Sequence, residues 1–371
     1  MAITKKIIFT VTNDLTYDQR MQRICTSMFK AGYKVVLVGR KLPNSNTTEP
    51  FSFEYKKLKC CFNTGFAFYA EYNIRLFFFL LFIKANAFCA IDLDTIIPNY
   101  FASVIRNKIR CYDAHELFTE QKEIITRPIV FKIWLGIEKF FVPKFKNGYT
   151  VNEFIKTEFW NRYQVNYQII RNLPQSANFK NSNEHLNFQL PSHFIIYQGA
   201  VNEGRSFETL VPAMQQINVP LVICGQGNFF EQTKALIKKY KLEHKIILLG
   251  YVTPAQLKLI THKALFGLTL FDKQGLNQYY SLCNRFFDYT MANIPQICIA
   301  YPEYVAINQL NPTALLIENT DTLTIAQAIN TLLNDATLYN SLQKNCYKAN
   351  AILNWENEAV NLIAYWKNLL A

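Results

Sequence analysis

The residues that could do chemistry gather in the stretch Gln278–Ala300, which reads QYYSLCNRFFDYTMANIPQICIA. A helix is expected to begin near Ser281 or Asn284, because both residue types are good N-caps. The open N-terminus of a helix carries unpaired N–H groups and a partial positive charge, which suit a phosphate. Asp288 lies on the same helical face, where its carboxylate could accept hydrogen bonds from sugar hydroxyls. An ordinary helix start with a surface aspartate is the alternative explanation.

Two strands are expected to hold this helix in place. The apolar segment Ala264–Phe271 is compatible with a strand, and a turn at Asp272–Gly275 follows it. Asn293 and Pro295 are expected to end the helix, with Asn293 in the left-handed conformation that Gly or Asn tolerates. Gln296–Ala300 then returns as a strand. A strand–loop–helix–strand unit of this kind is typical of α/β domains.

A second candidate phosphate contact follows the predicted strand Phe194–Gln198. The loop after this strand contains Gly199, Gly204 and Arg205. Glycines allow a backbone to approach a phosphate closely, and an arginine can bind a phosphate in a bidentate manner. We therefore expect this loop to stabilise negative charge, together with Arg285 of the helix described above.

An imidazole and two carboxylates follow a further predicted strand, Ile109–Asp113. Asp113, His115 and Glu116 enter a loop at the carboxyl end of that strand, where ligands bind in an open parallel sheet. A neutral His115 could hydrogen-bond a sugar hydroxyl or a developing charge, and Glu116 could orient it. A structural role is the alternative explanation for a lone histidine.

The chain opens with a strand, a polar loop, a helix and a second strand over residues 6–39, which is the pattern of a doubly wound sheet. The loop has no G-x-G-x-x-G motif, so no dinucleotide cofactor, and no other cofactor, is predicted. It contains Asp14, Asp18 and Arg20 instead, which are candidate contacts for an acceptor substrate. An N-cap at Asp18 and a helix salt bridge with Arg20 are an equally good explanation.

These segments together resemble the glycosyl transferases group 1, the retaining family 4, which have the GT-B fold. FFDYTMANIP is similar to the donor-site motif of that family, with Asp288 in the place of the second of two glutamates. Tyr280 stands where the first glutamate is usual. Arg205 falls on one of two diphosphate-binding cations of the family, and Ala200 falls on the other. The resemblance runs over nearly the whole chain.

The resemblance implies functional roles for particular residues. The implied donor-binding residues are Gly199, Arg205, Gly225, Gly227, Tyr251, Tyr280, Ser281, Leu282, Cys283, Asn284 and Arg285. The implied catalytic residues are His115, Glu116 and Asp288, and the implied acceptor contacts are Asp14, Asp18, Arg20 and Asp113. The resemblance implies no metal site.

The implied fold is α/β, with two Rossmann-like doubly wound parallel-sheet domains facing each other across a cleft. A length of 371 residues fits two domains. We expect an acceptor-binding domain at 1–175, a polar, Asn-rich linker at 176–190 and a nucleotide-sugar-binding domain at 191–350. A C-terminal helix within 351–371 is expected to pack back on the first domain.

Composition and net charge limit which cellular compartments and which binding partners are expected. The formal net charge of +12 favours anionic partners, but the basic residues are dispersed and no recognition motif appears, so nucleic acid is not expected. The nine cysteines include no C-x-x-C pair, which favours reduced thiols in the cytoplasm. The sequence begins without a secretory signal.

Two segments of the first domain raise the question of a membrane. Residues 65–88 are strongly aromatic, and Pro128–Phe145 is an amphipathic helix near Lys132, Lys139, Lys144 and Lys146. A buried helix and a solubilising basic face explain both. The alternative is peripheral association with an anionic membrane, on the inner face of the plasma membrane.

The expected function is transfer of a sugar from a UDP- or GDP-linked donor to a glycan or lipid-linked glycan in cell-surface polysaccharide synthesis. The resemblance implies retention of configuration and no required metal ion. A nucleotide-sugar epimerase or hydrolase of the same fold is an alternative. A degenerate subunit that binds nucleotide-sugar without turnover is another, and Tyr280 and Ala200 favour it.

Overall fold

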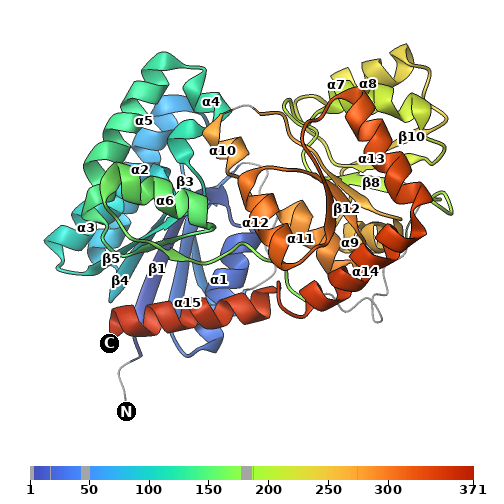
Figure 1. The fold of residues 1–371 in the computed structure, drawn as a ribbon. Helices are drawn as coiled ribbons and strands as arrows, with labels where there is room; N and C mark the ends of the chain where they lie inside the picture. The colour runs from blue at the N-terminus through green and yellow to red at the C-terminus, as the bar shows by residue number, and fades with distance from the viewer. Residues whose placement is uncertain (1–3, 17, 43–50, 177–185, 187, 274) are drawn as a thin grey trace. The chain divides into compact units, whose positions relative to one another are not determined.

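The computed structural model describes residues 4–16, 18–42, 51–176, 186, 188–273 and 275–371. The chain divides into two compact units, which are coloured along the chain in Figure 1. The first unit comprises residues 1–172 and 357–371, and the second comprises residues 173–356. Most of the expected linker at 176–190 lies outside the described residues.

The first unit is built on a seven-stranded parallel sheet with the order β3-β2-β1-β4-β5-β6-β7. Its strands are β1 (Lys6–Asp14), β2 (Lys34–Lys41), β3 (Glu54–Lys59), β4 (Ala87–Ile91), β5 (Ile109–Ala114), β6 (Gly148–Thr150) and β7 (Gln168–Ile169). Its helices are α1 (Gln19–Lys30), α2 (Gly65–Phe82), α3 (Ile96–Ile105), α4 (Lys122–Ile125), α5 (Pro128–Phe141), α6 (Glu153–Tyr163) and most of α15 (Trp355–Leu370). The strand order reverses between β1 and β4, so the strand ends beside this point are where such sheets bind ligands.

The C-terminal helix α15 packs on the sheet of the first unit. The rings of Phe9 on β1 and Trp366 on α15 lie 5.6 Å apart in an edge-to-face arrangement. Cys111 Sγ on β5 lies 3.5 Å from the hydroxyl of Tyr365. Trp366 is fully buried. These contacts explain why residues 357–371 belong with the first 172 residues although they are the last of the chain.

The second unit is built on a six-stranded parallel sheet with the order β10-β9-β8-β11-β12-β13. Its strands are β8 (Ile195–Gln198), β9 (Leu221–Cys224), β10 (Ile246–Gly250), β11 (Gly267–Thr269), β12 (Gln296–Ile299) and β13 (Ala314–Ile317). Its helices are α7 (Phe207–Ala213), α8 (Phe230–Lys239), α9 (Pro254–Lys263), α10 (Leu276–Tyr279), α11 (Asn284–Met291), α12 (Pro302–Leu310), α13 (Thr322–Asn334) and α14 (Ala336–Asn350). The strand order reverses between β8 and β11.

The predicted fold class is confirmed, because both units are parallel sheets covered by helices and have the strand order of doubly wound domains. The prediction was wrong about the N-cap of α11. This helix begins at Asn284 with Cys283 as its N-cap, and no side chain caps it. Ser281 lies before the helix, and its hydroxyl donates to the carbonyl of Gln278 at 2.8 Å. Asn293 has a φ of 58°, as predicted.

Candidate functional site

Two loops at the carboxyl edge of the second sheet are locked together by their own hydrogen bonds. The amide of Asn228 donates to Asn202 Oδ1 at 3.0 Å, and the amide of Glu203 donates to Asn228 Oδ1 at 3.0 Å. Gly225 is required by this contact, because a Cβ there would lie 1.8 Å from the carbonyl oxygen of Gly199. A Cβ on Gly227 would lie 2.1 Å from Asn202. Both predicted donor-site glycines therefore have a packing role in holding the loops.

The second unit places two guanidinium groups beside the Gly199 loop. The guanidinium of Arg285 lies over the ring of Tyr197, 4.4 Å from its centroid. It also borders Gly199, where a Cβ would lie 3.9 Å from Arg285 Cζ. The guanidinium of Arg205 lies 4.3 Å from the centroid of Phe271, and that of Arg285 lies 4.9 Å from the same ring. The sequence predicted both arginines at one site, and the structure brings them together.

These two arginines have no acidic partner among the described residues. Arg285 is 7% exposed, and its Nη1 has no hydrogen-bond partner; the same holds for Nε of Arg205. Burial lowers the pKa of Arg205, and repulsion from Arg285 lowers it further. A buried cation beside a partly buried one is costly without a carboxylate unless an anion joins them. This part of the sheet edge is therefore suited to an anionic group with several oxygens.

A buried amide holds the carboxylate of Asp288. Nε2 of Gln198, at the end of β8, donates to Asp288 Oδ2 at 3.0 Å. The hydroxyl of Thr261 on α9 donates to Gln198 Oε1 at 2.6 Å. Gln198 is 3% exposed, so this chain of hydrogen bonds is shielded from water. Sequence reasoning did not identify Gln198, although its place at a strand end beside Gly199 was a usable signal.

The remaining predicted donor residues lie around α10 and α11 and in the loop after β10. The amide of Cys283 is already engaged, because it donates to the hydroxyl of Tyr304 at 3.1 Å. Tyr280 follows α10, and its ring lies 5.1 Å from that of Tyr279. Tyr251 follows β10 and is 65% exposed. Leu282 is partly buried against the core of the unit.

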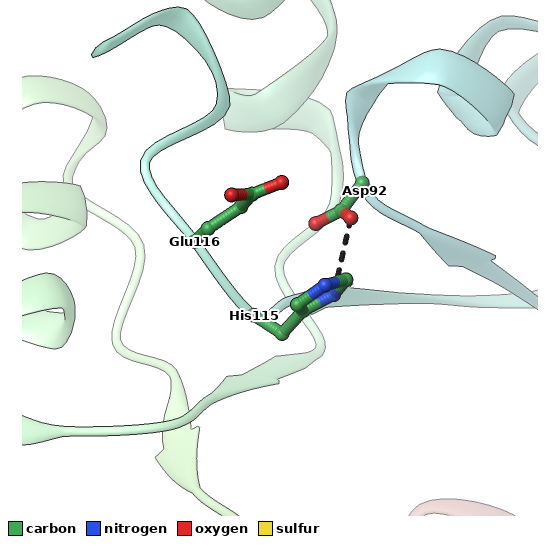
Figure 2. A group of neighbouring side chains, drawn as sticks. All are labelled: Asp92, His115 and Glu116. Carbon is green, nitrogen blue, oxygen red and sulfur yellow. Dashed lines mark ion pairs between the residues drawn. The ribbon is translucent and has the colours of Figure 1, made fainter. Parts of the chain in front are cut away.

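In the first unit, His115 meets a carboxylate that the sequence did not predict. His115 follows β5, and its Nδ1 lies 3.1 Å from Oδ2 of Asp92, the residue that follows β4. Figure 2 shows this contact. In the same view, the carboxylate of Glu116 points toward that of Asp92. Glu116 accepts a hydrogen bond from Gln121 Nε2. The carboxylate that lies beside His115 Nδ1 is therefore that of Asp92, whereas the sequence suggested Glu116.

Electrostatics in this group favours uncharged side chains. Burial and, to a smaller extent, the positive charge of Arg20 together lower the pKa of His115 to about 3, so the imidazole is neutral at pH 7. Burial raises the pKa of Asp92 well above its usual range, and Glu116 and Asp94 add to the shift. The ligand atoms of Asp92, His115 and Glu116 lie within 4.8 Å of one another. The three could share hydrogen bonds with a polyhydroxy ligand, and they have residue types that can hold a divalent cation.

The four predicted acceptor contacts have partners within the first unit. Arg20 Nη2 donates to Asp113 Oδ1 at 2.7 Å, and this ion pair is buried. Asp18 is the N-cap of α1, where Oδ1 accepts from the amide of Met21. Asp14 Oδ1 lies 3.7 Å from Nζ of Lys57. The expected helix salt bridge between Asp18 and Arg20 is replaced by the Arg20–Asp113 pair.

Comparisons with known proteins relate the second unit to one protein family. Residues 178–349, which lie within the second unit, match the family model of glycosyl transferases group 1. The chain resembles group 1 glycosyltransferases. No curated protein sequence matches it. The likeness predicted from the sequence is thus confirmed, and the second unit carries the family match.

Solved structures show the same fold over the whole chain. A sucrose-phosphate synthase from Thermosynechococcus elongatus is 17% identical, with a TM-score of 0.75 over 98% of this chain and 99% of that chain. A glycosyltransferase from Rickettsia africae is 12% identical, with a TM-score of 0.74 over 99% of each chain. Anabaena HepE in complex with UDP-glucose is 11% identical, with a TM-score of 0.74 over 98% and 99% of the two chains.

Proposed function

We propose that this protein transfers a sugar from a nucleotide-diphosphate sugar to a glycan or a lipid-linked glycan. The observation that carries the proposal is the pair of the partly buried Arg205 and the buried Arg285, which lacks a carboxylate partner among the described residues. A nucleoside diphosphate supplies the negative charge that this pair requires. The solved HepE structure holds UDP-glucose, which makes UDP-linked sugars the first donors to test.

The chemistry proposed for this site is stabilisation of the leaving group. The bond between the anomeric carbon and the diphosphate breaks while the acceptor oxygen forms its bond to that carbon. The two guanidinium groups would neutralise the charge that develops on the departing diphosphate, so no metal ion is needed there. For retention, the acceptor attacks from the side of the leaving group, and the acceptor proton passes to a phosphate oxygen. Asp288, held by Gln198, would bind the hydroxyls of the donor.

The position of Arg285 argues against a degenerate donor site. Ala200 occupies the place of one family cation, which leaves Arg205 alone in that loop. Arg285 reaches the backbone of Gly199 from α11 and supplies a second positive charge. We infer that Arg285 replaces the cation lost at position 200. Both charges that the diphosphate requires are then present, although they come from different elements.

In the first unit, we propose that Asp92, His115 and Glu116 bind hydroxyl groups of a sugar. Neutral His115 can donate or accept a hydrogen bond, according to the tautomer that Asp92 selects. The acceptor is proposed to be part of a cell-surface polysaccharide pathway, and the reaction is proposed to occur in the cytoplasm.

The function is tested with purified protein and a panel of UDP- and GDP-sugars, by measuring nucleotide release with and without glycan or lipid-linked acceptors. Release that depends on the acceptor is the expected result. Turnover without an acceptor would favour the epimerase or hydrolase alternative. Binding of nucleotide without any turnover would favour the non-catalytic subunit.

A further inference from the structure

Helix α2 presents an exposed apolar stripe. Phe66, Ile74, Phe78 and Phe82 are 77%, 58%, 55% and 82% exposed, and their spacing of four or eight residues puts them on one face of the helix. The opposite face is part of the core, where Phe68, Tyr72, Leu76 and Leu80 are buried. A soluble domain rarely leaves so many large apolar side chains together in water, so this stripe indicates a binding surface.

The neighbouring helices extend the apolar surface. Helix α2 packs against α3, and α3 packs against α5. The three helices lie together on one side of the first unit in Figure 1. Exposed large apolar residues on α3 and α5 are Phe101, Val104, Ile105, Ile129, Ile133 and Phe140. We call the exposed residues of α2, α3 and α5 the apolar flank.

The exposed charged residues within these three helices and directly after them are mainly basic. Exposed basic residues on these helices or in the segments that follow them are Arg75, Lys84, Lys132, Lys139 and Lys146. The acidic residues within the three helices are Glu71 and Glu138. Glu71 is neutralised by Arg75 at 2.8 Å and binds the amides of Cys61 and Phe62. Glu138 is 2% exposed and accepts from Thr119 at 2.5 Å.

An apolar surface with positive charges at its border fits a bilayer that contains anionic lipids. Apolar side chains enter the boundary between headgroups and acyl chains, while lysines reach the phosphates. A protein partner would need a complementary acidic rim, whereas a second copy of this chain would bring the same positive charges into contact. The charge pattern therefore selects lipid among the occupants of this surface.

Helix α2 is the one helix among the described residues that is long and apolar enough to cross a membrane. Four of its residues are buried in the core of the first unit, beside Ile8 of β1, Val36 of β2 and Phe88 of β4. Crossing a bilayer would pull these residues out of the core and expose the face of the sheet that they cover. A helix anchored in this way can lie in the membrane surface but cannot span it while the unit is folded.

We propose that the apolar flank docks the protein on the surface of an anionic lipid bilayer, with α2 lying parallel to the surface. This inference goes beyond sugar transfer and does not depend on the donor site, because vesicle binding is measured without nucleotide or acceptor.

Co-sedimentation of the full chain with vesicles tests the proposal. The vesicles contain phosphatidylcholine alone or phosphatidylcholine with about one-third phosphatidylglycerol. We expect binding to the anionic vesicles at low salt, at least about tenfold weaker binding to neutral vesicles, and weakening as salt rises. No binding to anionic vesicles at low salt would overturn the proposal.

Two matched triple variants distinguish vesicle binding by the apolar flank from nonspecific binding by any exposed apolar side chains. The flank variant carries Ile74→Ser, Phe78→Ser and Phe82→Ser, and the control carries Leu310→Ser, Leu323→Ser and Tyr347→Ser. The control residues lie in the second unit and are 82%, 57% and 58% exposed. We expect the flank variant to lose vesicle binding at least about tenfold and the control to bind as wild type does. Equal binding of the two variants would contradict the proposal.

A charge variant tests the electrostatic part separately. Lys132→Gln, Lys139→Gln, Lys144→Gln and Lys146→Gln together should lower binding to anionic vesicles at least about tenfold and remove most of its salt dependence. Circular dichroism and thermal melting establish that each variant is folded. A concentration-dependent dimer that the flank variant abolishes, without vesicle binding by wild type, would show that the surface binds a second copy instead.

Discussion

The amide of Gln198 donates a hydrogen bond of 3.0 Å to the carboxylate of Asp288. Thr261 holds the other end of this amide at 2.6 Å. The three residues come from β8, α9 and α11. Asp288 is therefore fixed by a buried side chain that is itself fixed, which is how a binding carboxylate is kept in one orientation.

Replacing Gln198 by Leu should weaken donor binding while the fold persists. The substitution removes the amide that positions Asp288 and keeps a buried side chain of similar size. We expect KM for the nucleotide-sugar to rise about three- to tenfold, with a smaller effect on kcat. Steady-state kinetics measures this. The double variant with Asp288→Asn should be scarcely worse than Asp288→Asn alone, because Gln198 acts through Asp288. Additive losses would mean that Gln198 has a separate role.

Asp288→Asn keeps the shape of the side chain and removes its charge. Transfer activity should fall at least about tenfold, because a carboxylate binds hydroxyls more strongly than an amide does. The melting temperature should stay near that of wild type, since Gln198 can still form a hydrogen bond to the amide oxygen. A large fall in melting temperature with normal specific activity would make Asp288 a structural residue of α11.

The variant Arg205→Met should have opposite effects on the stability of the ligand-free protein and on the binding of UDP. The apolar stem can remain over Phe271, while a desolvated charge next to Arg285 is removed. The melting temperature without ligand should therefore be equal to or above that of wild type. The increase in melting temperature that UDP causes in wild type should shrink, because a phosphate contact of roughly 1.5–3 kcal/mol is lost. A wild-type response to UDP in this variant would remove Arg205 from the site.

Asp94 makes the first unit sensitive to pH. Burial raises the pKa of Asp94 to about 7, although a hydrogen bond from Thr12 opposes this. An ordinary aspartate in an unfolded chain titrates near pH 3.9. The stability that comes from the protonated carboxyl is thus complete below pH ~4 and is lost as pH rises toward 7.

In the variant Asp94→Asn, the stability of the fold should not fall in this way as pH rises, because the amide has no proton to release. The melting temperature of the variant minus that of wild type should therefore increase between pH 5 and pH 8. Asp321→Asn, at an exposed position, is the matched control. A difference for Asp94→Asn that is the same at both pH values would contradict the raised pKa.

The periodicity of the sequence was sufficient for the fold, but not for the contacts between distant loops. The sequence patterns predict helices over Glu153–Tyr163 and Trp355–Leu370, and these are the bounds of α6 and α15, because apolar spacing and flanking residues are local signals. Strand β13 and helices α8 and α12 were not predicted. Leu310, at the end of α12, is 82% exposed, so the apolar pattern of that helix does not follow its burial.

The site residues that the sequence did not reveal are those that depend on strand order. Asp92 and His115 are neighbours because β4 and β5 pair in parallel and both residues follow the strand ends. Gln198 reaches Asp288 because β8 pairs with β11 and α11 follows the loop after β11. Both relationships need the strand order, which local sequence patterns do not state. A search for polar residues after every predicted strand could have found Asp92.

Arg205 and Arg285 together are expected to bind a nucleoside diphosphate. Calorimetric titration with UDP measures this binding, with uridine as the matched ligand that lacks the diphosphate. Wild type should bind UDP far more tightly than uridine. Arg285→Met should weaken UDP binding by about 10- to 100-fold, the equivalent of roughly 1.5–3 kcal/mol, and should leave uridine binding unchanged. Equal affinity of wild type and a folded Arg285→Met variant for UDP, or equal affinity of wild type for UDP and uridine, would contradict the account.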